Sequence, residues 1–412
     1  MTRRVYGPVR DWATDFDHTD PEYNASAPDI WRSLRERCPM AHSERFGGMW
    51  VPLTYDLIRA VAYDATHFTS RSVVVSTIPP KGVSPVGSAP PITSDPPFHR
   101  EARGVLQPLF APRAVEATEP KVRAICERLL SDLPEGKSHF DASMEYARRI
   151  PVVVMAQWLG IPDGDHELIV GFVHDLLEAV GEDADAQQPG RDRLDRYLSE
   201  QIAAHRAQPS DDLISYLLSA TIDGRRLSDS HIAGTIMLLL LAGVDTTWSA
   251  ISSALWHLAR TPGDAERMRS DPQAMPVAVE ELLRAYAPVT MARVVKEDCN
   301  FAGYSLRAGE WVLLPFPAAN RDPSKFSDPD EVKLDRVDNR HAAFGLGMHR
   351  CLGSHLARLE LRVALECFLS RVQSFTLDAT RDVVWSQGQV RGPRRLPLRV
   401  TVSPPTPARE VP

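Results

Sequence analysis

The spacing of apolar residues predicts a mainly helical chain. The longest apolar helical stretch follows Ser228, a residue type that caps helices, and runs to about Arg260, where Thr261, Pro262 and Gly263 end it. The remaining helical patterns are shorter. They cover residues 30–37, 55–62, 97–109, 120–130, 141–159, 164–180, 191–207, 211–220, 266–268, 276–286 and 352–368.

Strand patterns are few and concentrated late in the chain. One strand is predicted at Met49 to Pro52, several short strands with turns lie between Arg293 and Phe316, and strand pairs follow from Phe375 to Val402. The fold class is therefore mainly α with small β-sheets. We expect a single domain over residues 25–404, an N-terminal extension at 1–24 and a C-terminal tail at 405–412.

Two segments have neither pattern. Residues 73–93 are rich in Pro, Val, Ser and Gly, and a loop of that length in a compact domain is usually functional or disordered. Residues 181–190 are acidic and polar, which predicts a surface loop.

Composition narrows the classes of function. The net charge of −7 provides no basic field for nucleic acid. The five cysteines are scattered without a C-x-x-C pair, which argues against a disulfide framework, a zinc finger and a protein-held iron–sulfur cluster. The polar N-terminus has no signal peptide, and the apolar run Ile236 to Val244 is shorter than the ~20 residues of a membrane span. We therefore expect a soluble cytoplasmic protein without a membrane partner.

One cysteine lies in a setting that favours metal binding. The segment from Phe344 to Gly353 places Cys351 directly after a glycine-containing loop, and a helix is predicted to begin at Leu352. A thiolate at a helix start is stabilised by backbone N–H groups and the helix dipole, so we expect this sulfur to stay deprotonated. The alternative is an inert buried cysteine, the common fate of a lone thiol.

The same segment resembles the haem-binding signature of soluble bacterial cytochrome P450 enzymes. The pattern Phe-x-x-Gly-x-x-x-Cys-x-Gly is matched by Phe344, Gly347, Cys351 and Gly353. The resemblance implies the cytochrome P450 fold, haem b as cofactor and Cys351 as the axial thiolate on its iron. It also implies that Phe344, Gly345, His349, Gly353 and Ala357 help to bind the cofactor.

An acid followed by an alcohol interrupts the long apolar helix. Asp and Thr compete with the backbone for hydrogen bonds and weaken a helix locally, so their use in Asp245-Thr246 suits a proton relay. The family motif matches Ala242, Gly243, Asp245 and Thr246. It implies that Asp245 and Thr246 are catalytic in dioxygen activation and that Ala242 and Gly243 lie against the cofactor. The alternative is that both polar side chains face solvent or bond to the preceding turn.

Glu281 and Arg284 lie on one face of a predicted helix. Such a pair is a weak signal by itself, because surface ion pairs of this spacing are common. In its place along the chain it resembles the Glu-x-x-Arg motif of the family. The resemblance implies a structural network that also includes a downstream arginine, for which Arg336 is our candidate.

Four basic residues are candidates to bind the haem propionates. His99 and Arg103 are four residues apart and share a helix face. Carboxylates need cationic, bidentate donors. Arg293 and His349 complete the set by resemblance, and the alternative is a solvated polar helix face.

The resemblance also implies a substrate pocket above the haem. Its predicted lining residues are Val74, Ile92, Leu239, Val289, Thr290, Met291 and Gln387. Most of these side chains are apolar, and Thr290 and Gln387 are the polar exceptions. Such a pocket suits a small apolar organic molecule.

The implied activity is monooxygenation, most simply hydroxylation in secondary-metabolite, terpenoid or aromatic metabolism. The chain has no flavin or nicotinamide motif, so we expect electrons from a ferredoxin and an NAD(P)H-dependent ferredoxin reductase, and a monomeric enzyme. An acidic ferredoxin would need a basic face near Cys351. The available arginines are Arg100, Arg103, Arg113, Arg350, Arg358 and Arg362.

Three other functions stay open from the sequence. A peroxide-dependent haem-thiolate enzyme would not need Asp245 or Thr246. A non-catalytic recruitment protein of cytochrome P450 type should lack the cysteine or the acid–alcohol pair. A helical enzyme without haem would carry Cys351 by chance.

Overall fold

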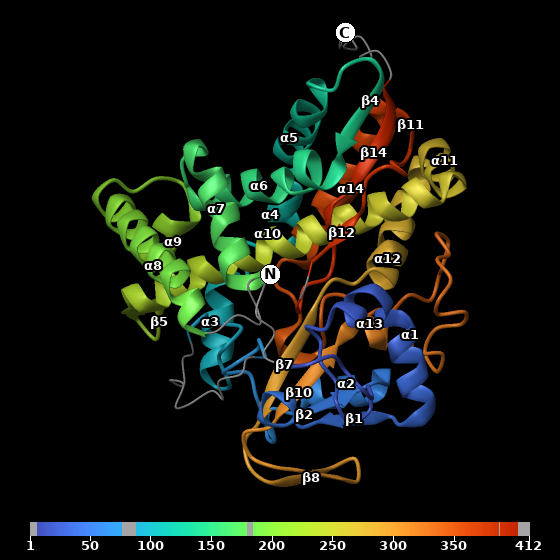
Figure 1. The fold of residues 1–412 in the computed structure, drawn as a ribbon. Coiled ribbons are helices and arrows are strands. Elements are labelled where there is room, and N and C mark those ends of the chain that lie inside the picture. Colours follow the sequence, from blue (N-terminus) through green and yellow to red (C-terminus); the bar gives the residue numbers. More distant parts are fainter. Residues whose placement is uncertain (1–5, 76–87, 179–183, 387, 403–412) are drawn as a thin grey trace.

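The computed structural model describes residues 6–75, 88–178, 184–386 and 388–402. Within these residues the fold is mainly helical with small sheets, which confirms the predicted fold class. Figure 1 shows a sheet-containing end around β1, β2, β7 and β10, and a larger helical body crossed by α10.

Helix α10 (Asp229–Arg260) is the centre of the helical body. Its start agrees with the prediction, because the Ser228 side chain accepts a hydrogen bond from the His231 N–H. It packs against α6 (Arg149–Leu159), α8 (Ala184–Ala207) and α14 (Ser354–Arg371). In the described part of the chain it is the one helix long and apolar enough to span a membrane, yet 61% of its most apolar window is buried inside the fold. We therefore interpret α10 as a core helix.

The remaining helices surround α10 or cover the sheets. They are α1 (Pro21–Arg37), α2 (Tyr55–Tyr63), α3 (Phe98–Leu106), α4 (Pro112–Glu116), α5 (Glu119–Ser131), α7 (His166–Val173), α9 (Leu213–Ser219), α11 (Pro262–Ser270), α12 (Met275–Ala285) and α13 (Phe316–Ala319). Short 3-10 turns occur at Arg45–Gly47, Asp163–Asp165, Pro272–Ala274 and Gly347–His349, and π-helical turns at Ala142–Ala147 and His174–Glu178.

Two sheets contain most of the strands. The larger has the order β1 (Met40–Ser43), β2 (Met49–Pro52), β10 (Trp311–Pro315), β7 (Thr290–Val295) and β3 (Phe68–Thr69). The other has the order β11 (Val372–Leu377), β14 (Pro397–Val402) and β4 (Gly136–Asp141). The two-stranded pairs are β5 (Thr221–Ile222) with β6 (Arg225–Arg226), β8 (Cys299–Phe301) with β9 (Tyr304–Leu306), and β12 (Val384–Trp385) with β13 (Pro393–Arg395).

Several predicted boundaries differ from the structure. The helix expected at 141–159 is interrupted, because Asp141 ends β4 and its side chain caps the π-helical turn through the Ser143 and Met144 N–H groups. The loop expected at 181–190 is helical from Ala184 onward. The helix expected from Leu352 begins at Ser354, after Gly353 has completed the turn.

The segment expected as an N-terminal extension contributes to the core. Phe16 is 0% exposed and Tyr23 is 3% exposed. Trp31 Nε1 donates to the Tyr23 hydroxyl at 3.1 Å, and α1 begins at Pro21. The expected boundary at residue 24 therefore falls inside a helix.

Candidate functional site

The cysteine loop is closed by its own backbone. The Cys351 N–H donates to Phe344 O at 2.7 Å, and Gly345 and Gly347 both have a φ of 71°. A Cβ on Gly347 would lie 2.3 Å from Ala62 O, so only glycine allows α2 to approach the loop this closely. The Ala357 N–H then donates to Gly353 O at 2.9 Å as α14 begins.

The Cys351 thiol is accessible to solvent and at the same time surrounded by protein. The residue is exposed to solvent, yet the surrounding protein is dense enough for burial to raise the pKa of its thiol. The Gly353 N–H and the charges of Arg103, Arg350 and Arg358 act in the opposite direction but do not outweigh burial. The expectation that the helix start alone keeps this sulfur deprotonated is therefore wrong, whereas a coordinated metal ion deprotonates a thiol outright.

Four basic side chains gather beside Cys351. The His99 and His349 rings lie 4.3 Å apart, and Arg293 is 5% exposed. Burial lowers the pKa of Arg293 to about 10, and burial together with Arg293, His99 and Arg103 lowers the pKa of His349 to about 2. The structure thus brings together the four residues expected to bind propionates, two of them arginines whose positive charges an anion would offset.

This cluster fits a haem. Among the described residues His99 Nε2 is buried without a hydrogen-bond partner, and Arg293 Nη1 donates to Ala292 O at 2.8 Å. Two propionate carboxylates would satisfy such donors and offset the buried positive charge. The nearby thiol is the ligand type that haem iron accepts from a protein.

One stripe of residues along α10 is only partly buried. Leu238 and Thr246 are half-buried and Ala242 is exposed, although they belong to the central helix. Their spacing of four residues places them on one face. Thr246 Oγ1 donates to Ala242 O at 2.8 Å, the bond to the preceding turn that the sequence left open. Gly243 instead packs against α6, since a Cβ there would lie 2.8 Å from Met155 Sδ.

Asp245 does not lie on this stripe. Successive residues of a helix differ by about 100°, and the Asp245 carboxylate is fully buried on the neighbouring face. Arg394 Nη2, from β13, donates to Asp245 Oδ1 at 2.5 Å, and Arg394 Nη1 donates to Ser249 Oγ at 2.8 Å. Sequence reasoning missed Arg394, because no local pattern connects positions 149 residues apart.

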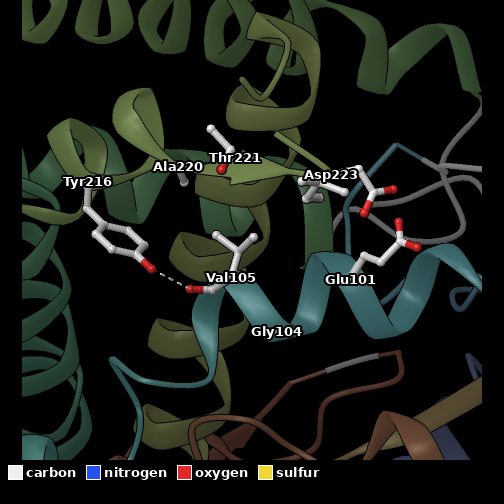
Figure 2. Close-up of a pocket in the computed structure, with 8 residues that line it drawn as sticks. Glu101, Gly104, Val105, Tyr216, Ala220, Thr221 and Asp223 are labelled. Atoms are coloured by element: carbon white, nitrogen blue, oxygen red, sulfur yellow. Dashed lines mark hydrogen bonds between the residues drawn. The ribbon is translucent and has the colours of Figure 1, made fainter. Parts of the chain in front are cut away.

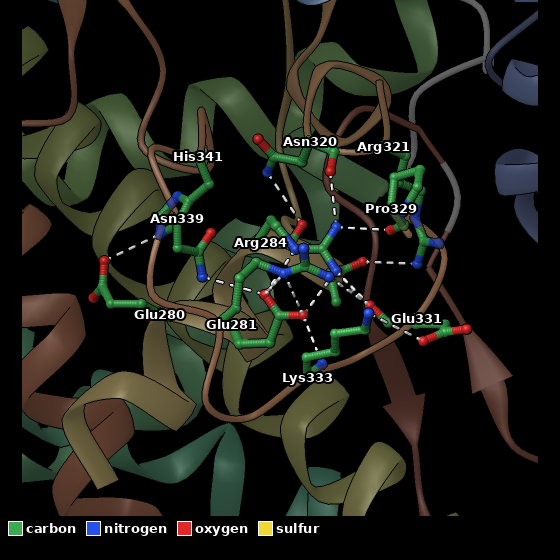
Figure 3. Close-up of polar contacts among 12 residues, drawn as sticks. Glu280, Glu281, Arg284, Asn320, Arg321, Pro329, Glu331, Lys333, Asn339 and His341 are labelled. Atoms are coloured by element: carbon green, nitrogen blue, oxygen red, sulfur yellow. Dashed lines mark hydrogen bonds and ion pairs between the residues drawn. The ribbon is translucent and has the colours of Figure 1, made fainter. Parts of the chain in front are cut away.

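Glu281 and Arg284 form the buried network shown in Figure 3. Arg284 Nε donates to Glu281 Oε2 at 2.7 Å, and both side chains are 0% exposed. Arg336 Nε donates to the same carboxylate at 3.0 and 3.1 Å, and Asn339 Nδ2 donates to it at 3.2 Å. Arg284 also donates to the backbone carbonyls of Asn320, Pro329 and Glu331. The network therefore anchors the segment that leads to the cysteine loop.

The expected substrate wall is only partly as predicted. Val289 and Met291 are half-buried and share a face of β7 with Arg293, because strand side chains alternate. Thr290 lies on the other face, near the Tyr23 hydroxyl, whose pKa it lowers, so its side chain is directed away from the expected pocket. Leu239 is 9% exposed within the core, and Gln387 lies outside the described residues.

Val74 and Ile92 are the wall residues from the long irregular segment. Both are half-buried. The turn before Ile92 rests on α10: Thr235 Oγ1 donates to Pro90 O at 3.2 Å, and a Cβ on Gly234 would lie 2.3 Å from Ser88 O.

A separate surface hollow of about 450 Å³ lies on the other side of α3 from His99 and Arg103. Figure 2 shows it between α3 and the end of α9, with Tyr216 donating to Val105 O at 2.9 Å. Its lining residues are Glu101, Gly104, Val105, Tyr216, Ala220, Thr221, Ile222 and Asp223. None of them belongs to the predicted site.

Comparisons with known proteins show the family of the chain. A family model described as Cytochrome P450 matches residues 169–389. The chain is 35% identical over 346 residues to a probable cytochrome P450 127A1 of Sinorhizobium fredii, with 84% of this chain and 82% of the relative covered. It is 32% identical over 355 residues to mycinamicin IV hydroxylase/epoxidase of Micromonospora griseorubida, covering 85% and 89%.

Solved structures have the same fold. A mutant of P450 EryK in complex with erythromycin B superimposes with a TM-score of 0.84 at 32% identity, covering 93% of this chain and 98% of that one.

Proposed function

Since the chain belongs to the cytochrome P450 family, whose members are haem-thiolate monooxygenases, we propose that it oxidises a small apolar organic substrate with electrons from a ferredoxin and its reductase. The observation that carries this proposal is the thiol of Cys351 beside the four-residue basic cluster of His99, Arg103, Arg293 and His349. Secondary metabolism is the favoured setting, because relatives include a mycinamicin IV hydroxylase/epoxidase and a nocardicin C N-oxygenase.

The cofactor is haem b. When bound, it supplies the activation of dioxygen and the insertion of one oxygen atom into the substrate. Cys351 would bind its iron, and the basic cluster would bind its propionates. The Cys351 N–H bond to Phe344 O and the glycines at 345 and 347 hold the loop in place for this role.

Thr246 and Asp245 have different places in the proposed proton route. The Thr246 hydroxyl lies on the α10 face that carries exposed Ala242, so of the two residues it is the one that would face a bound haem. The Asp245 carboxylate is held by Arg394 on the adjacent face. In this arrangement Thr246 would hold or pass a proton on the cofactor side of α10, and Asp245 would act through it from the adjacent face.

The substrate contacts are proposed to be apolar. Val74, Val289 and Met291 supply aliphatic or thioether surface on the side of β7 that faces the basic cluster. Thr290 lies on the other face of the strand, near Tyr23. A neutral, largely hydrocarbon substrate suits such a wall.

The surface for the electron donor is smaller than the sequence indicates. Arg358 is paired with Glu280 at 2.5 Å, and Arg362 is paired with Glu119 at 2.5 Å. Arg103 donates to Arg350 O. The exposed arginines that remain for an acidic ferredoxin are Arg100, Arg113 and Arg350. We propose a monomeric cytoplasmic enzyme that meets its ferredoxin through these residues.

The spectrum of the reduced carbon monoxide complex tests the proposal. The purified protein should show the red-shifted Soret band of thiolate ligation, Cys351→Ser should lose it, and Cys38→Ser, a half-buried cysteine elsewhere, should keep it. A wild-type protein without this band would refute the assignment. Turnover of an accepted substrate with hydrogen peroxide, but none with ferredoxin, reductase and NADPH, would favour the peroxide-dependent alternative.

A further inference from the structure

The buried side chain of Gln389 joins segments that are distant in the sequence. It is 6% exposed and lies just beyond the predicted pocket residue at 387. Its Oε1 accepts from the Val75 N–H at 2.6 Å, and its Nε2 donates to Thr290 O at 2.9 Å and to Val73 O at 3.3 Å. The amide thus uses both its donor and acceptor capacity on backbone groups.

Backbone contacts place the same three segments side by side. The Thr290 N–H donates to Gln389 O at 2.8 Å, the Ala292 N–H donates to Val73 O at 3.0 Å, and Val289 forms an antiparallel bridge with Val390. Residues 73–75 therefore run beside β7 without being a regular strand. The Gln389 side chain supplies the hydrogen bonds that a neighbouring strand would otherwise make.

The contacts with Gln389 determine which way Val74 points. Val75 is 1% exposed and packs in the same core cluster as Ala292, on one face of β7. Because side chains alternate, Val74 lies on the opposite face, together with Met291 and Arg293. Gln389 holds the backbone on both sides of Val74, through Val73 O and Val75 N.

We propose that Gln389 is a positioning residue for the substrate wall, setting how Val74 lies against Val289 and Met291 and thereby the shape of molecule that is accepted. This inference rests on the proposed function, since it requires a substrate above the haem. Gln389 itself does not touch the substrate. It acts through the backbone of the residues that do.

Replacement by leucine removes all three side-chain bonds at nearly constant volume. The Val75 N–H, the Thr290 carbonyl and the Val73 carbonyl then lose a partner, so residues 73–75 no longer have one fixed position against β7. A ligand that fills the space beside this wall must then order it on binding, which lowers its affinity. A ligand too small to reach the wall is not affected.

Two azoles of different size separate these cases. Both bind haem iron through a ring nitrogen, but only the larger one extends to the wall. The dissociation constants of imidazole and 4-phenylimidazole are measured from the Soret shift of the haem-loaded protein. In Gln389→Leu we expect the constant for 4-phenylimidazole to rise about tenfold, corresponding to about 1.4 kcal/mol, and that for imidazole to stay within about twofold. Gln389→Asn, which is one methylene shorter, should act in the same direction, and Gln273→Leu at an exposed site should change neither.

Each result bears on the proposal. Equal changes for both azoles would indicate general loosening and would overturn it, as would failure of both Gln389 variants to fold or bind haem. The carbon monoxide band of the wild type separates this inference from the proposed function: a normal thiolate band with an unchanged ratio of the two constants refutes only the role of Gln389.

Discussion

A buried acid in α14 provides a stability prediction that does not depend on the substrate. Glu360 is 1% exposed, and its Oε2 has no hydrogen-bond partner among the described residues. Burial raises the pKa of its carboxyl from 4.5 to about 8. Between pH 4.5 and pH 8 the carboxyl is therefore protonated in the folded protein and ionised in the unfolded chain. The free energy of unfolding falls as pH rises through this window.

The magnitude follows from the width of the window. Each pH unit between the two pKa values is worth 1.36 kcal/mol, so at pH 7 the loss is about 3 kcal/mol. Gln at this position has the same shape and no proton to lose. We expect Glu360→Gln to stabilise the protein by about 2–3 kcal/mol at pH 7–8 and by less than about 1 kcal/mol at pH 5, after the cost of burying an amide.

Urea unfolding followed by circular dichroism at pH 5 and pH 8 measures this difference. Glu127→Gln on α5 is the matched control, because Glu127 is exposed and should give no pH-dependent change. Other titrating groups are the same in wild type and variant, so their contributions cancel in the comparison. An equal effect of Glu360→Gln at both pH values would refute the reasoning, because it would mean that the acid gains no proton on folding.

Three further predictions concern the site and its support. Thr246→Ala should keep the thiolate-type carbon monoxide band but divert reducing equivalents to peroxide, measured as hydrogen peroxide formed per NADPH consumed; unchanged coupling would remove Thr246 from the proton route. Arg336→Met should lower the free energy of unfolding by about 3 kcal/mol, because it breaks a buried ion pair with Glu281, and a loss below about 1 kcal/mol in urea unfolding would contradict the structural role. His18 is fully buried, and burial lowers its pKa from 6.5 to about 4, so stability should fall by about 1.4 kcal/mol per unit as pH drops from 6.5 to 4. His18→Phe should flatten that slope in melting temperatures measured across this range, and an unchanged slope would assign the acid sensitivity to other groups.

The sequence predicts features that depend on local spacing. The cap at Ser228, the position of α10 and the mainly helical fold follow from residues that are neighbours along the chain. The Glu281–Arg284 pair was also visible at helical spacing, and the structure brings Arg336 to it. Spacing alone did not predict that Arg336 contacts Glu281. That expectation came from the resemblance to the family.

What could not be predicted depends on long-range contacts. The ion pair of Asp245 with Arg394 and the bonds of Gln389 to Val73 and Val75 join positions with no shared period. The direction of the Cys351 pKa was missed for a related reason. Helix position is visible in a sequence, whereas the burial that outweighs it is produced by the whole fold.

The ion pair between Asp245 and Arg394 has a consequence for synthesis on the ribosome. Because 149 residues separate the two, Arg394 emerges roughly 7–30 s after Asp245 at ordinary translation rates. Strand β4 waits even longer for β14, its partner near the end of the chain. The central helix therefore cannot complete its packing until residues 393–402 have been made.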